Sequence, residues 1–132
     1  MKTTNKQTPV LVTGASGYIA SWIVKYLLDE GNVVHGTVRS LADPTKTAHL
    51  LYMQEAYPEK LKLFEADLLK EGSFAPAMEG CNIVIHTASP FIIEKIANPR
   101  KQLIEPALEG TRNVLRTVNQ TSTVERVVLT SS

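Results

Sequence analysis

Three small residues in the segment VTGASGYIASW (12–22) have the type and spacing of a turn that binds a phosphate. Gly14 would allow a tight turn, Gly17 would let the backbone approach a pyrophosphate without a Cβ, and Ala20 would let a helix pack closely on a sheet. Free N–H groups and the positive end of the helix dipole would then hold the phosphate oxygens, with Ser16 adding a hydroxyl donor. In the alternative interpretation, the small residues only tighten a strand–helix turn.

The residue at the end of the following strand distinguishes the two nicotinamide dinucleotides. An acidic side chain there binds the ribose hydroxyls of NAD, whereas an arginine accepts the 2′-phosphate of NADP. The segment TVRS places Arg39 at this position. A solvated surface arginine is the alternative interpretation of Arg39. Lys46 could add a second positive charge, although for Lys46 alone a solvated surface lysine is the favoured interpretation. The sequence therefore predicts NADP(H) as the preferred cofactor and leaves NAD(H) open.

The elements that must position these residues alternate along the chain. Apolar or alternating patterns predict five strands, at 9–14, 32–39, 61–67, 81–89 and 124–132. Helical signals lie between them, in the segments 19–30, 43–57, 71–80 and 98–118. Strands that alternate with helices imply right-handed crossovers and a parallel sheet with helices on both faces. The predicted fold class is α/β, a doubly wound parallel sheet of the Rossmann type.

Periodicity also predicts which helix faces are buried. In the first helix, the apolar residues recur at helical spacing and place Trp22 and Tyr26 in the core. In the last helix, the same spacing predicts an apolar face made of Leu103, Ile104, Ala107, Leu108, Thr111, Val114, Leu115 and Val118. His86 lies late in an apolar strand, so we expect a packed and hydrogen-bonded histidine rather than a catalytic one.

Composition and charge exclude several classes of function. The 132 residues have a net charge of only +1, and the longest basic cluster is Arg100-Lys101, which argues against nucleic-acid binding. No apolar run reaches the roughly 18–20 residues of a membrane span, and MKTTNKQT at the start has no apolar core of a signal peptide. Cys81 is the single cysteine, which excludes an internal disulfide. We expect a cytoplasmic protein without a metal site.

Five segments together indicate a family. VTGASGYIASW, TVRS, EADL, HTASPF and ERVVLTSS resemble, in order and spacing, the extended short-chain dehydrogenase/reductase family, which is NAD-dependent epimerase/dehydratase-like. The most similar subgroup is the dihydroflavonol 4-reductase and cinnamoyl-CoA reductase-like one, and the resemblance spans residues 10–132. It implies hydride transfer from NADPH to the carbonyl of a small aldehyde or ketone.

The resemblance implies roles for residues at the pyrophosphate and adenosine end. The pyrophosphate turn would be lined by Gly14, Ser16, Gly17, Tyr18 and Ile19. Arg39, helped by Lys46, would hold the 2′-phosphate. Adenine would lie beside Leu68, and Asp67 would accept a hydrogen bond from its amino group. Asp67 could instead cap the segment that follows it.

The resemblance also implies roles at the nicotinamide end. The ribose would lie beside Thr87, Ala88 and Ser89. The floor of the site would hold Thr130 and Ser131, and Ser132 would be the catalytic hydroxyl that orients the substrate carbonyl.

The family's proton donor is the feature that the 132 residues do not contain. Members use Tyr-x-x-x-Lys, in which the nearby lysine lowers the pKa of the tyrosine. None of the four tyrosines here is followed by a lysine at this spacing. We therefore expect residues 1–132 to form an incomplete NAD(P)-binding domain without a substrate domain, inactive alone. A non-catalytic NADP(H)-binding module is one alternative, and a sugar-nucleotide epimerase or dehydratase is another, which Ala20 and Arg39 argue against. Substrate identity and a homodimeric state stay open.

Overall fold

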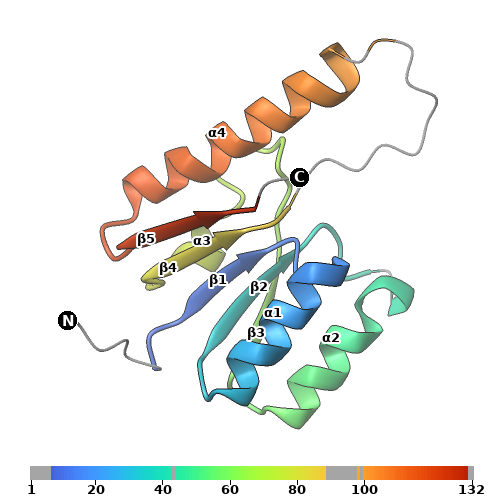
Figure 1. Cartoon of the computed structure of the whole chain (residues 1–132), viewed down its shortest axis with the longest axis vertical. Coiled ribbons are helices and arrows are strands. Elements are labelled where there is room, and N and C mark those ends of the chain that lie inside the picture. The colour runs from blue at the N-terminus through green and yellow to red at the C-terminus, as the bar shows by residue number, and fades with distance from the viewer. Residues whose placement is uncertain (1–6, 43, 89–97, 99, 131–132) are drawn as a thin grey trace.

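The computed structural model describes residues 7–42, 44–88, 98 and 100–130. It contains one sheet of five parallel strands in the order β3-β2-β1-β4-β5 (Figure 1). The strands are β1 (Val10–Thr13), β2 (Val34–Val38), β3 (Leu61–Glu65), β4 (Ile83–His86) and β5 (Arg126–Leu129). The helices are α1 (Tyr18–Asp29), α2 (Pro44–Ala56), α3 (Ala75–Met78) and α4 (Glu105–Gln120), and α4 is preceded by a π-helical turn, η1 (Arg100–Ile104). The predicted α/β class is confirmed.

Helices cover both faces of the sheet because neighbouring strand residues point to opposite sides. In β1, Val12 packs in a core cluster with α1 and α2, whereas Leu11 packs in a second cluster with α3 and α4 (Figure 1). The chain proceeds outward from β1 to β2 and β3, and then returns to place β4 on the other side of β1. This reversal between β1 and β4 opens a crevice at the carboxyl ends of the strands, which is where ligands bind in doubly wound folds.

The predicted buried face of α1 is wrong for two of its aromatic residues. Trp22 is 59% exposed and Tyr26 is 66% exposed, and the residues buried against the sheet are Ala20, Val24 and Leu28. Trp22 lies two positions after Ala20, which is about 200° around the helix. The small Ala20 faces the sheet and lets α1 approach the sheet closely, as expected. The side chains of Trp22 and Tyr26 lie away from this face and therefore point outward.

The predicted face of α4 is also partly wrong. Ile104 just before the helix, Leu108 and Leu115 are 54%, 49% and 37% exposed. Val114 is buried as predicted, and the buried positions of the helix are Gly110, Asn113, Val114 and Thr117. The buried face includes Asn113 because its side-chain amide makes hydrogen bonds to the loop after β3, which no apolar residue could make.

The last helix also begins differently from its prediction. A regular helix from residue 98 was expected, but Arg100–Ile104 is a π-helical turn and α4 begins at Glu105. Pro106 has no N–H to donate to the carbonyl four residues earlier, so the α-helical hydrogen-bond ladder is interrupted there and the preceding turn widens.

None of the helices in the described ranges combines the length and apolarity that a membrane span needs.

Candidate nucleotide-binding site

The turn between β1 and α1 is fixed by contacts to the two neighbouring strands. Gly14 has a φ of +64°, and a Cβ built on it would lie 2.8 Å from the Cα of Ala88, just after β4. The Gly14 N–H donates to Thr37 Oγ1 at 3.2 Å, and the Ala15 N–H donates to the Thr37 carbonyl at 2.8 Å. The fold itself therefore requires glycine at position 14.

Gly17 differs from Gly14 because the fold places no such demand on it. Its φ is −67°, which any residue adopts, and the nearest atom to a built Cβ is the Gly14 carbonyl oxygen at 3.3 Å. Gly17 is the N-cap residue of α1, and no side chain caps this helix. The N–H groups of the first turn of α1 therefore lie beside a residue without a side chain and have no side-chain cap.

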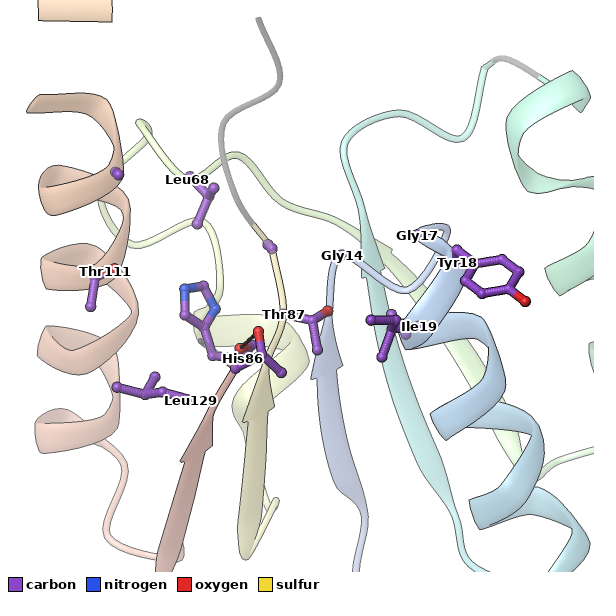
Figure 2. Close-up of a pocket in the computed structure, with 13 residues that line it drawn as sticks. Gly14, Gly17, Tyr18, Ile19, Leu68, His86, Thr87, Thr111 and Leu129 are labelled. Carbon is purple, nitrogen blue, oxygen red and sulfur yellow. Dashed lines mark hydrogen bonds between the residues drawn. The ribbon is translucent and has the colours of Figure 1, made fainter. Parts of the chain in front are cut away.

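A cavity of about 550 Å³ opens at the carboxyl ends of the strands, between α1 and α4 (Figure 2). The glycine turn and Ile19 lie on one side of it, and Leu68 and Thr111 lie on the other. Of the residues predicted to bind the cofactor, those that line it are Gly14, Gly17, Tyr18, Ile19, Leu68, Thr87, Ala88 and Thr130. Ser89, Ser131 and Ser132 lie outside the described residues.

Five lining residues were not among those predicted to bind: Ala20, His86, Ala107, Thr111 and Leu129. Ala107 and Thr111 come from α4 and were counted only as part of its apolar face. Their spacing of one helical turn and their small size were the available signals.

Among the described residues, no group of three or more His, Cys, Asp or Glu side chains could hold a metal ion.

The other predicted cofactor residues lie outside the cavity lining. Ser16 belongs to the turn, Arg39 follows β2 directly, and Lys46 is in α2. Arg39 and Lys46 are both exposed. The hydrogen bonds of Thr37 to the glycine turn bring the carboxyl end of β2 next to this turn, so Arg39 follows two residues after that junction.

Asp67 has a local partner. Its Oδ1 accepts a hydrogen bond from the Leu69 N–H at 2.9 Å, and the hydroxyl of Ser73 donates to its carbonyl oxygen at 2.7 Å. The carboxylate thus has the capping role that the sequence offered as an alternative. Contact with adenine stays a prediction.

His86 anchors the segment after β4, and it is buried and hydrogen-bonded as expected. Thr13 Oγ1 accepts from the N–H groups of Thr87 at 3.0 Å and Ala88 at 3.1 Å. Both lone pairs of this hydroxyl are then used, so its hydrogen must be donated to His86 Nδ1, which lies 2.7 Å away. His86 is therefore neutral, with its hydrogen on Nε2. Burial lowers the pKa of His86, which agrees with this neutral form.

Comparison with known proteins identifies the family of this site. Residues 10–132 match the NAD dependent epimerase/dehydratase family. The chain belongs to this family. Cinnamoyl-CoA reductase CAD2 of Medicago truncatula is 49% identical over 132 residues, which cover 100% of this chain and 40% of the relative. Tetraketide alpha-pyrone reductase 1 of Arabidopsis thaliana is 51% identical over 93% of this chain and 37% of its own length.

Solved structures of family members have the same fold. Gre2 of Candida albicans in complex with NADPH matches with a TM-score of 0.80 at 36% identity, over 94% of this chain and 37% of that chain. Vestitone reductase from alfalfa matches with a TM-score of 0.69 at 35% identity, over 93% of this chain and 36% of that chain. The resemblance to reductases of the dihydroflavonol and cinnamoyl-CoA type is confirmed, and the chain spans about 40% of the length of the Medicago truncatula reductase.

The residues present fit the dinucleotide that the family name implies. A pyrophosphate on the α1 N-terminus would approach the backbone at Gly17, where no side-chain cap occupies the N–H groups. A Cβ at Gly17 would lie 3.3 Å from the Gly14 carbonyl oxygen, which is a tight contact, so the turn itself and a bound phosphate both favour glycine there.

The neutral state of His86 predicts a loss of stability in acid. Its pKa is lower in the folded chain than in the unfolded chain, so its contribution is complete above the unfolded value near 6.5 and is lost as the pH falls through the folded value. Asn in place of His86 can accept the Thr13 hydrogen but cannot be protonated. We expect His86→Asn to reduce the difference in urea-unfolding free energy between pH 7.5 and pH 5.

His35 provides the comparison for this measurement, because burial also lowers the pKa of His35. The double variant with His35→Asn should lose more of the acid sensitivity than either single variant. An unchanged pH dependence in His86→Asn would contradict the neutral state assigned to His86.

Proposed function

We propose that this chain is the cofactor-binding part of an NADPH-dependent carbonyl reductase that transfers hydride to an aldehyde or ketone. The observation that carries the proposal is the glycine turn at the head of the 550 Å³ cavity, beside the strand end that bears Arg39. Two further facts support it. Relatives at 49% and 51% identity are named as reductases, and Gre2 of Candida albicans was solved with NADPH.

In this proposal the chain binds and orients the cofactor. The first turn of α1 holds the pyrophosphate on N–H groups, and the side chains of Arg39 and Lys46 hold the 2′-phosphate. Adenine lies against Leu68. The segment that follows β4, fixed by Thr13 and His86, holds the nicotinamide ribose.

The carbonyl chemistry needs groups at the end of β5 and beyond. The bound dinucleotide would supply the hydride. Ser132 would orient the carbonyl oxygen, and a tyrosine with a lowered pKa would donate the proton. Since the 132 residues contain no Tyr-x-x-x-Lys, we propose that this donor belongs to the longer enzyme and that the chain alone binds NADPH without turnover. The same observation favours a non-catalytic NADP(H)-binding module as the second candidate.

Titration of the chain with NADPH and NADH, followed by nicotinamide fluorescence, tests the proposal. We expect saturable NADPH binding that is at least about tenfold tighter than NADH binding, since hydrogen bonds to a charged group are worth about 1.5–3 kcal/mol. Binding of neither dinucleotide would contradict the proposed site, and equal binding would contradict the NADPH preference. A Tyr-x-x-x-Lys in the reading frame after Ser132 would decide for the reductase over the module.

A further inference from the structure

One buried amide of α4 donates both of its hydrogens to the loop after β3 and accepts a hydrogen bond from the same loop. Asn113 is 4% exposed. Its Nδ2 donates to the carbonyl oxygens of Leu68 at 2.9 Å and Lys70 at 2.8 Å, and its Oδ1 accepts from the Gly72 N–H at 3.2 Å. The amide has two hydrogens, so these two donated bonds and one accepted bond clamp the loop on three of its residues.

The same face of α4 touches the first of these residues directly. A Cβ built on Gly110 would lie 3.0 Å from the Cβ of Leu68 and 3.2 Å from its Cδ2. Gly110 is buried in the helix, so it is there for close approach and not for an unusual backbone angle. Leu68 is thus held from two sides, by its carbonyl at Asn113 and by its side chain at Gly110.

Leu68 is the point at which this clamp reaches the candidate site. Its side chain lines the cavity opposite the glycine turn, together with Thr111 of α4 (Figure 2). Asn113 itself is not part of the cavity lining. Any influence of Asn113 on a ligand must therefore pass through the loop.

We propose that Asn113, supported by Gly110, is a positioning residue that sets the affinity of the site for the adenine end of the dinucleotide. The inference rests on the proposed function, because it takes Leu68 as the surface against which adenine lies. Without the amide, the partly buried carbonyls of Leu68 and Lys70 and the N–H of Gly72 lose their partner, and the loop must move toward water to satisfy them. Leu68 would then leave its position, whereas the glycine turn, held by Thr37, would not.

The test compares the two halves of NADPH. The affinities of 2′,5′-ADP and of reduced nicotinamide mononucleotide are measured by ligand-observed NMR for the chain, for Asn113→Leu and for the milder Gly110→Ala. We expect both variants to bind 2′,5′-ADP more weakly, by about tenfold for Asn113→Leu, and to bind the mononucleotide as the original chain does. A global loss of structure would weaken both ligands equally.

Thr117→Val is the matched control. Thr117 is buried one turn further along α4, and its hydroxyl donates to the Asn113 carbonyl within the helix at 3.0 Å. This variant should bind both halves normally. Equal weakening of both ligands in Asn113→Leu and Gly110→Ala, or no weakening, would overturn the inference. Failure of the original chain to bind 2′,5′-ADP would instead overturn the proposed function.

Discussion

Replacing Gly14 with alanine is expected to destabilise the chain by about 2–5 kcal/mol and to abolish NADPH binding. Two costs add at this position. A non-glycine residue at a φ of +64° loses about 1–2 kcal/mol, and a methyl group 2.8 Å from the Ala88 Cα forces the β1–α1 turn and the segment after β4 apart at a further cost of about 1–3 kcal/mol. Urea denaturation gives the free energy, and NADPH fluorescence reports binding.

Gly80→Ala is the matched control for this prediction. Gly80 has a φ of +79°, but nothing lies within 4 Å of its built Cβ. The control variant should therefore show only the backbone cost, about 1–2 kcal/mol, and should bind NADPH normally. Equal destabilisation of the two variants would contradict the tight contact between Gly14 and Ala88.

Replacing Arg39 with alanine should remove the preference for NADPH over NADH. A guanidinium that pairs with the 2′-phosphate contributes about 1.5–3 kcal/mol, so NADPH affinity should fall about 10- to 100-fold. NADH affinity should change little, because NADH has no phosphate at this position. Parallel titrations of the two dinucleotides measure the ratio.

Arg126→Ala controls for the change in net charge. Arg126 is also exposed, but it begins β5 at the opposite end of the strands from the glycine turn. Its removal should leave the NADPH-to-NADH ratio unchanged. A ratio that is unchanged in Arg39→Ala, or lowered equally in both variants, would contradict a specific contact between Arg39 and the 2′-phosphate.

The sequence by itself determined the order of the elements and the character of the turn. Val10–Thr13 is an apolar run rich in β-branched residues, and Gly14 and Gly17 follow it at a spacing that is visible within a few residues. Pro44 at the first position of α2 is a local signal as well. Patterns of this kind act within a few residues, so they can be read from a short window of sequence.

Only the tertiary structure decided which faces are buried and what completes the site. Helical periodicity treats Trp22 like any other apolar residue and predicts that it is buried. In the structure the small Ala20 packs against the sheet, and the indole of Trp22 points outward. Asn113 is buried because its partners lie in a loop more than 40 residues earlier, and His86 is fixed by Thr13, 73 residues away. Hydrogen bonds and steric contacts between distant segments exist only after the strands are paired, so no window of sequence contains them.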